Sequence, residues 1–548
     1  MKRRLLSASA GAAMLIVLVA LSAGAVAKNG RSPGFHTSEP AMLTGVNGTT
    51  VTPIISVGDT LAGGYTFEAI PDGISVAKKG RRSVDILVNH ELSLVPFPAT
   101  RQDPSNSVVS KLRLHRRGAG VLRGSFAITA AAGYQRFCSN FLVGKKHGFE
   151  RPLLFTNEEA RDIVLRQEDS WHQPGVQLSE PGAEQAGVVV AYDLKSGKYR
   201  SIYGMGRHNH ENAVGVPGYG RPVILSGDDT FDAPASQLYL YAAASGKKVW
   251  RDKGTLYAFV SDDPAINDYG DLSTASPSVT GRFIQVPREI ATGKDAEDGH
   301  EVTSADFGYP TPAQAVPATP AMPDGPQWVL EHWSNINNVF QFIRIEDIAY
   351  DRKHGKTVYF ADTAEPRAIP HPTTTRLFRG PSGTQGEYMN GRLYKLRLNS
   401  KNPLGTATLS ILPGANFDDL GYQNANAPHQ PDNVETTKKA VYFQEDPGSH
   451  NAQPSFADAT NARIWRYDLK THELTVVAEV DQSMSPITNK GAWESSGIVD
   501  ASAAFGRGAF LVDVQAHGWD HDAGAGNDPP AVPKRERGQL LLIRVPNP

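Results

Sequence analysis

The sequence predicts an all-β protein with the architecture of a β-propeller. Short apolar and β-branched runs alternate with clusters of Gly, Asn, Asp and Pro, as is typical of many short strands joined by turns. The 52 glycines and 38 prolines are spread along all 548 residues, which suits tight turns and disfavours long helices. Residues 192–197 (YDLKSG) recur loosely as residues 467–472 (YDLKTH). A degenerate repeat of this kind indicates stacked blades.

The predicted strands are runs of apolar and aromatic residues that end at turn residues. A tandem of β-sandwiches is the alternative, although the chain has no Cys-Trp-Cys framework of the immunoglobulin type. The strands are expected at residues 84–88, 187–194, 199–203, 238–241, 249–250, 348–351, 357–360, 391–396, 440–444 and 462–469.

The chain is expected to hold a signal peptide at residues 1–27 and a single catalytic propeller domain at residues 28–548. Basic residues precede an apolar run of about 14 residues, and small residues before Lys28 suit a signal peptidase. We therefore expect a secreted or cell-envelope protein, exported by the Sec or the twin-arginine route, without a transmembrane segment in the mature chain. Insertions are expected near residues 160–186 and 260–330, where the repeat is interrupted.

Composition and missing motifs exclude several classes of function. A net charge of −2 with 20% charged residues does not provide the basic surface that nucleic-acid binding requires. The chain contains no phosphate-binding GxxxxGK[ST] loop, no CxxC and no HExxH, and its GxSxG match at residues 30–34 (GRSPG) follows the predicted signal peptide and not a predicted strand. Serine hydrolases, P-loop enzymes, zinc fingers and zincins are therefore disfavoured.

A lone cysteine and several acidic motifs predict a metal centre. Cys138 has no second cysteine with which to form a disulfide, so in an oxidising compartment its sulfur must be buried or committed to a metal. Acidic residues at strand ends can converge on the axis of a propeller and bind hard cations. These motifs are Glu158-Glu159, His210-Glu211, Glu346-Asp347 and Asp432-Asn433.

Each of these features also has a purely structural interpretation. Cys138 could be an inert thiol in the core, because free cysteine is often buried. Glu158-Glu159 could be a solvated turn, Asp228-Asp229 is expected to cap a turn, and Arg344 with Glu346 could be a structural ion pair.

The motifs occur in the same order as in a known family, the PhoX-type alkaline phosphatases, which the chain resembles over most of its mature length. No single motif is specific, and the ordered set carries the resemblance. The motifs are Asn89-His90-Glu91, Cys138 followed by Asn157-Glu158-Glu159, residues 207–211 (RHNHE), residues 344–348 (RIEDI), Pro431-Asp432-Asn433, and residues 494–497 (ESSG) followed by residues 514–517 (VQAH).

The resemblance implies a six-bladed propeller that hydrolyses phosphate esters with two iron ions and calcium. It implies that Cys138 bridges the iron ions as a thiolate and that Arg344 binds the substrate phosphate, with Glu346 also in the catalytic centre. A guanidinium suits phosphate, and anionic oxygen and sulfur suit trivalent iron. The implied iron carboxylates are Glu159, Glu211 and Glu346, and the implied calcium ligands are Glu91, Asp432 and Asn433.

The expected partner is thus a small phosphate ester. Two other functions remain open at this stage. One is a calcium-dependent enzyme on the same fold, such as a lactonase or a phytase-like propeller without iron. The other is a secreted, non-catalytic propeller that binds a partner and keeps calcium for rigidity.

Overall fold

The computed structural model describes residues 34–91, 106–166, 181–230, 236–293, 326–370, 376–380, 384–421, 423–448, 460–485, 489–517 and 536–548. The predicted signal peptide at residues 1–27 lies outside these ranges, as do residues 167–180 and 294–325 of the two predicted insertions. None of the described helices is long and apolar enough to cross a membrane.

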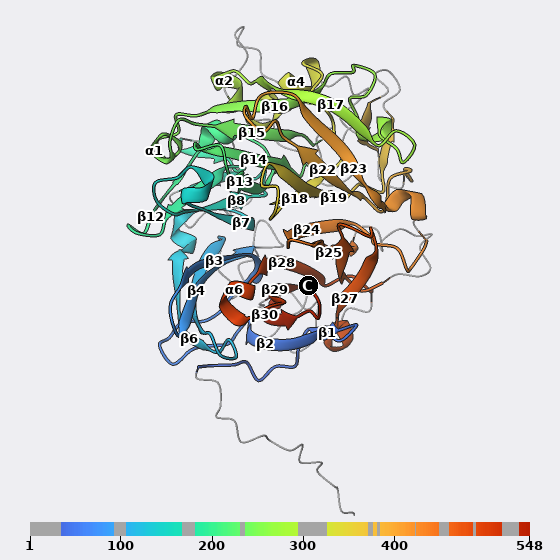
Figure 1. Cartoon of the computed structure of the whole chain (residues 1–548). Coiled ribbons are helices and arrows are strands. Elements are labelled where there is room, and N and C mark those ends of the chain that lie inside the picture. Colours follow the sequence, from blue (N-terminus) through green and yellow to red (C-terminus); the bar gives the residue numbers. More distant parts are fainter. Residues whose placement is uncertain are drawn as a thin grey trace, which may run out of the picture.

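The described strands form antiparallel sheets arranged as a β-propeller (Figure 1), which confirms the predicted fold class. Three sheets have four strands, a five-stranded sheet adds β1 to four others, and a nine-stranded sheet joins two neighbouring groups where β17 pairs with β23. The strands thus divide into six units of four. The innermost strands form a closed ring in which β3 lies beside β7, followed by β13, β18, β24, β28 and β3 again.

Each unit runs from an inner strand outward. The first unit contains β3 (Ile70–Lys79), β4 (Ser83–Glu91), β5 (Val108–His115) and β6 (Val121–Ile128). The second contains β7 (Phe137–Val143), β8 (Leu153–Glu158), β11 (Val189–Asp193) and β12 (Lys198–Ser201). The third contains β13 (His210–Gly215), β14 (Val223–Asp228), β15 (Leu238–Ala242) and β16 (Thr255–Ser261), and β17 (Ser278–Gln285) extends it. The fourth unit contains β18 (Ile345–Tyr350), β19 (Thr357–Asp362), β22 (Arg392–Arg397) and β23 (Ala407–Asn416). The fifth contains β24 (Pro431–Thr436), β25 (Ala440–Glu445), β26 (Arg463–Asp468) and β27 (Leu474–Val480). The sixth contains β28 (Glu494–Asp500), β29 (Ala509–Ala516), β30 (Arg537–Arg544) and β2 (Thr50–Ser56).

Two N-terminal strands close the ring. β2 is the outer strand of the unit that β28, β29 and the C-terminal β30 begin, and β1 (Leu43–Gly45) pairs with β27 of the preceding unit. Because segments from the two ends of the sequence share sheets, the first and last units cannot separate without breaking ladder hydrogen bonds.

The remaining elements are short and lie in the connections. Two small hairpins pair β9 (Ile163–Leu165) with β10 (Ala183–Gln185) and β20 (Ala368–Pro370) with β21 (Leu377–Arg379). The helices are η1 (Ala130–Ala132), η2 (Lys145–His147), η3 (Tyr203–Met205), α1 (Gly246–Trp250), η4 (Tyr269–Asp271), α2 (Arg288–Ala291), α4 (Pro326–Ile336), η6 (Phe417–Leu420), η7 (Gln482–Met484) and α6 (Ser502–Phe505).

The strand predicted at residues 249–250 is wrong, because these residues end helix α1. Ser245 is the N-cap, and its side chain accepts a hydrogen bond from the backbone N–H of Lys248. The Ser-Gly pair that the pattern predicts as a turn between strands is therefore a helix start. The two copies of the repeated motif do form equivalent turns, since Asp193 and Asp468 each accept a backbone N–H two residues later.

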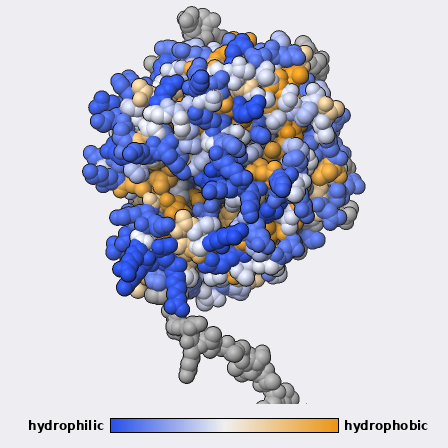
Figure 2. Space-filling view, viewed as in Figure 1, coloured by the Kyte–Doolittle hydropathy of each residue, from blue (hydrophilic) through white to orange (hydrophobic). Residues whose placement is uncertain are grey.

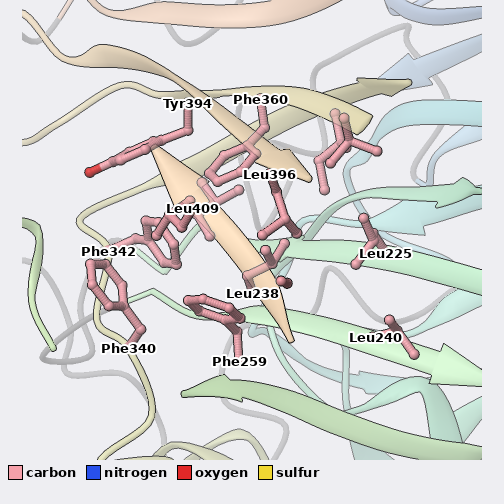
Figure 3. Packing of buried hydrophobic residues seen from close by; sticks show 14 of the residues in the cluster. Leu225, Leu238, Leu240, Phe259, Phe340, Phe342, Phe360, Tyr394, Leu396 and Leu409 are labelled. Atoms are coloured by element: carbon pink, nitrogen blue, oxygen red, sulfur yellow. The ribbon is translucent and has the colours of Figure 1, made fainter. Parts of the chain in front are cut away.

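Apolar side chains fill the spaces between neighbouring units. The cluster between the third and fourth units is rich in aromatic rings, such as Phe342 and Tyr394, whose centroids lie 5.3 Å apart (Figure 3). The face seen in Figure 2 is mostly polar, with small scattered apolar patches.

Every inner strand carries a β-bulge close to its start, where two residues oppose a single residue of the neighbouring strand. A bulge bends the strand and redirects its side chains. The first residues of the six bulge pairs are Asp72, Cys138, Glu211, Glu346, Asp432 and Ser496, and the second residues are Gly73, Ser139, Asn212, Asp347, Asn433 and Gly497.

Buried amide side chains support these bulges. Asn89 of the first unit donates to the carbonyl oxygen of Cys138 at 2.6 Å, and Asn157 donates to that of Ser139 at 2.9 Å. Gln444 likewise donates to the carbonyl of Ser496 at 3.2 Å. These bonds satisfy backbone groups of the bulge strands in the buried centre of the molecule.

We expect Gly73→Ala to destabilise the protein by about 1–3 kcal/mol. A β-carbon at position 73 would lie 2.4 Å from the backbone nitrogen of Asn140, so two inner strands would have to move apart. The free energy of unfolding in urea measures the effect. Gly63→Ala is the control, because a β-carbon at position 63 meets nothing within 4 Å; equal stability of the two variants would contradict the close contact between β3 and β7.

Candidate metal centre

The bulges bring acidic side chains and one thiol together around the axis of the propeller. The described residues contain four groups of three ligand atoms, and the atoms of each group lie within 4.8 Å of one another. Consecutive groups share Cys138, Glu211 and Asp432, so the four form one continuous chain. The groups are Asp72, Glu91 and Cys138; Cys138, Glu159 and Glu211; Glu211, Glu346 and Asp432; and Asp432, Asp446 and Glu494.

The first group contains the thiol. Cys138 Sγ donates to Asp72 Oδ2 at 2.9 Å, and Ser496 Oγ donates to Asp72 Oδ1 at 2.8 Å. Gln515 Nε2 donates to Asp72 at 3.1 Å and lies 3.4 Å from Glu91. Burial and then the negative charges of neighbouring carboxylates, Asp72 first, raise the pKa of Cys138 well above its usual value. A cation at this position would reverse that effect and favour the thiolate.

Glu211 links the second and third groups. Its Oε1 accepts from Ser139 Oγ at 2.8 Å, whereas its Oε2 is buried without a hydrogen-bond partner. Asp432 Oδ1 is likewise buried without a partner. Buried carboxylate oxygens of folded proteins are usually paired, so two unpaired oxygens in adjoining groups are suited to hold cations.

Arg344 lies beside the third group. Its Nε and Nη2 donate to the two oxygens of Asp229 at 2.8 and 2.9 Å, and Nη2 also lies 3.0 Å from Glu346 Oε1. Thr363 Oγ1 donates to the same oxygen of Glu346 at 2.7 Å. The bidentate pairing with Asp229 fixes the plane of the guanidinium.

Burial and mutual repulsion raise the pKa values of these carboxyl groups. For Glu159, Glu211, Asp432 and Glu494, burial is the largest cause and neighbouring carboxylates add to it. The pKa of Glu91 rises to about 7 for the same two reasons, with Asp72 as the main neighbour. Without cations, these groups therefore retain protons that free carboxyl groups would have released.

The structure brings together most of the residues predicted from the sequence. Cys138, Glu91, Glu159, Glu211, Glu346 and Asp432 all belong to the four groups, and Arg344 touches Glu346. Asn433 lies next to them, but its Oδ1 accepts from the backbone N–H of Gly497 at 3.0 Å and from Ser496 Oγ at 3.1 Å. The assignments of these residues to iron or to calcium all stay predictions.

Four acidic residues of the site were not predicted from the sequence: Asp72, Asp229, Asp446 and Glu494. The Asp228-Asp229 pair was expected to cap a turn; Asp228 does bond Thr230 locally, whereas Asp229 holds Arg344. Position within the strand was a signal that could have identified Asp72. Asp72, Cys138, Glu211, Glu346 and Asp432 each lie within the first three residues of an inner strand.

Comparison with known proteins shows no family whose model matches the chain and no curated protein that matches it. Solved structures resemble it weakly. A protein of unknown function from Dyadobacter fermentans has a TM-score of 0.40 and 10% identity, with 91% of this chain and all of that chain covered. The Trypanosoma rangeli sialidase has a TM-score of 0.33 and 8% identity over 91% of this chain and 60% of its own. The NanB sialidase of Streptococcus pneumoniae has a TM-score of 0.36 and 6% identity over 86% of this chain and 68% of its own.

We expect chelator-treated protein to lose stability as the pH rises from about 5 to about 8. The folded state binds a proton on Glu91 up to a pKa of about 7, whereas an unfolded glutamate releases it near pH 4.3. Unfolding therefore releases a proton in this window, so a rising pH favours the unfolded state, by about 3 kcal/mol for Glu91 alone.

Melting temperatures between pH 5 and 8, measured with chelator and with added calcium, test this expectation. Calcium should reduce the loss, because a bound cation removes the repulsion that retains the protons. Glu91→Gln should make the chelated protein less sensitive to pH. A melting temperature that rises with pH in chelator would contradict the arrangement of charges.

Proposed function

We propose that this protein is a metal-dependent hydrolase of small phosphate esters. The observation that carries the proposal is the chain of four ligand groups that share Cys138, Glu211 and Asp432 beside a buried arginine. Linked groups of this kind suit several cations held side by side. The resemblance of the motifs to PhoX-type phosphatases supports the same conclusion, because six of its seven implied metal ligands lie in these groups.

We assign the two kinds of cation from the chemistry of the ligands. The group of Cys138, Glu159 and Glu211 combines a thiolate with carboxylates and suits iron, and Glu346, in the adjoining group that shares Glu211, would be a further iron ligand. The group of Asp432, Asp446 and Glu494 offers carboxylate oxygens only, which suits calcium. Glu91 and Asp72, at the other end of the chain of groups, provide further oxygens.

When bound, the cations would polarise a phosphoryl oxygen and activate an oxygen nucleophile. Arg344 would bind the phosphate of the ester, since a guanidinium matches its oxygens. Asp229 and Glu346 hold that guanidinium at the edge of the third group, so it is oriented before the substrate arrives. Ser139 and Thr363 fix the carboxylates of Glu211 and Glu346.

The export of the protein remains part of the proposal. A secreted or cell-envelope location rests on residues 1–27, which lie outside the described part of the structure. Such a location would give the enzyme access to external phosphate esters and to calcium.

Elemental analysis of purified protein should find both iron and calcium, together with the visible absorption of an iron-thiolate bond. Cys138→Ser should lose the absorption and most of the phosphatase activity, measured on a panel of phosphomonoesters and phosphodiesters. Calcium without iron, with full activity of Cys138→Ala, would instead indicate a calcium-dependent enzyme. Inactivity of the wild type with both metals supplied would favour the non-catalytic binding module.

Asp229→Asn should lower kcat/KM by about ten-fold to a hundred-fold, because an amide cannot accept both N–H groups of Arg344. Asp262→Asn is the matched control, since Asp262 pairs with Arg282 at 2.6 Å on the exposed surface. Steady-state kinetics with a monoester measure both variants, and iron content checks that the metal centre persists. Unchanged kinetics in Asp229→Asn would remove Asp229 from a positioning role.

A further inference from the structure

A cavity extends from the bulges toward the far ends of the inner strands, on the side away from the acidic groups. The bulges are near the start of each inner strand, and the cavity is lined by residues farther along the same strands, such as residues 140–143, 347–350 and 498–500. Its volume is about 460 Å³, which falls within the range of small-molecule sites. The residues that line it are not among the four ligand groups.

Two buried polar side chains in the wall of this cavity each leave one atom without a hydrogen bond. His147 is 2% exposed, and its Nδ1 accepts from the backbone N–H of Gly144 at 3.0 Å. The proton of the neutral ring is therefore on Nε2, and Nε2 has no partner. Asn212 is 3% exposed, and its amide nitrogen donates to Asp347 while its Oδ1 has no partner. The wall thus offers one donor and one acceptor.

Charged side chains of both signs line the cavity, and the excess of positive charge lies in the groove that adjoins it. Lys145, Lys146 and Arg352 line the cavity, and Glu435 pairs with Arg352. Asp347 and Asp500 also line the cavity; Asp347 accepts from Asn212 and from the backbone N–H groups of Ile348 and Val434, and Asp500 accepts from the backbone N–H of Ser502.

An adjoining groove shares Lys146, Tyr350 and Arg352 with the cavity. It adds Lys356, Lys395 and Arg397, and Asp351 is the acid among its described lining residues. The groove would attract an anion toward the cavity.

The cavity wall also carries an aromatic surface. The rings of Phe141 and Tyr350 lie edge to face with centroids 6.2 Å apart, and the ring of His147 lies within 6 Å of both, at 5.3 and 5.8 Å. Lys146 lies 5.0 Å from the centre of the Tyr350 ring and donates to its hydroxyl. A ligand in this cavity would meet an apolar face, a cation, a donor and an acceptor together.

We propose that this cavity binds a small hydroxylated organic anion, such as a sugar acid. The anionic group accepts hydrogen bonds from Lys146 Nζ and His147 Nε2, a hydroxyl donates to Asn212 Oδ1, and the carbon skeleton lies against Phe141 and Tyr350. The site is separate from the acidic groups and does not rest on the proposed hydrolysis.

Isothermal titration calorimetry of the full chain with glucuronate tests this site, with glucose and acetate as probes that each carry half of the recognised chemistry. We expect glucuronate to bind at least ten-fold more tightly than either half. Lys146→Met should weaken glucuronate binding about ten-fold and leave glucose unaffected, because the ammonium contacts only the anionic group. His147→Phe should also weaken glucuronate binding. Lys198→Met, an exposed position on β12, should change nothing.

The proposal is overturned if glucuronate binds no more tightly than acetate, or if Lys146→Met and His147→Phe both bind it as the wild type does. Lys146 is exposed, so its replacement tests the site even if His147→Phe fails to fold. Asp432→Asn separates the two ends of the axis. It should abolish ester hydrolysis and retain glucuronate binding, whereas loss of glucuronate binding in that variant would place the anion at the acidic groups.

Discussion

Electrostatic repulsion among buried carboxyl groups on the axis is the constraint around which the molecule is organised. Asp72, Glu211 and Glu346 are buried and Asp432 is partly buried; they come from four different inner strands and belong to one chain of ligand groups. Bringing them together as anions is unfavourable unless protons or cations compensate the charge. A ring of strands that is closed by pairing between the two ends of the sequence can hold such an arrangement, because no single strand can withdraw alone.

The bulges interrupt the regular alternation of side chains at the start of each inner strand, and the two residues of each bulge have different roles. In each inner strand, the first bulge residue belongs to the ligand groups or contacts them, whereas the second is not a member of these groups and in two strands lines the cavity. Glu211 and Asn212 illustrate the division: the carboxylate joins two ligand groups, whereas the amide lines the cavity at the other end. A regular strand would direct these two consecutive side chains to opposite faces of its sheet, whereas a bulge interrupts that alternation.

The sequence predicted the β-propeller class, nine of the described strands, of which only β18 is an inner strand, and six of the residues that form the groups. It did so because strand ends and acidic residues are local signals. The register shifts were not predictable, because a bulge depends on which strand lies opposite and on amides such as Asn89 that reach it from a neighbouring unit. Asp229 was misjudged for a related reason: its partner Arg344 is 115 positions away, and an Asp-Asp pair after a glycine has a sufficient local explanation as a turn.

The strands that pair with the inner strands show a physical difference between acidic residues that can bind cations and those that are structural. Where two polar residues lie at the end of such a strand, the carboxylate of the first accepts hydrogen bonds from donors of the protein. Glu158 accepts from Arg166 and the backbone N–H of Gln135, and Asp362 accepts from three backbone N–H groups. Glu445 accepts from Arg463 and Trp465. The residue that follows, Glu159 or Asp446, offers an oxygen to a ligand group instead. Acidic residues one position apart therefore differ in role because the first is saturated with hydrogen bonds. This difference of hydrogen bonding, rather than the acidic character of the motif, identifies the side chains that are left to bind cations.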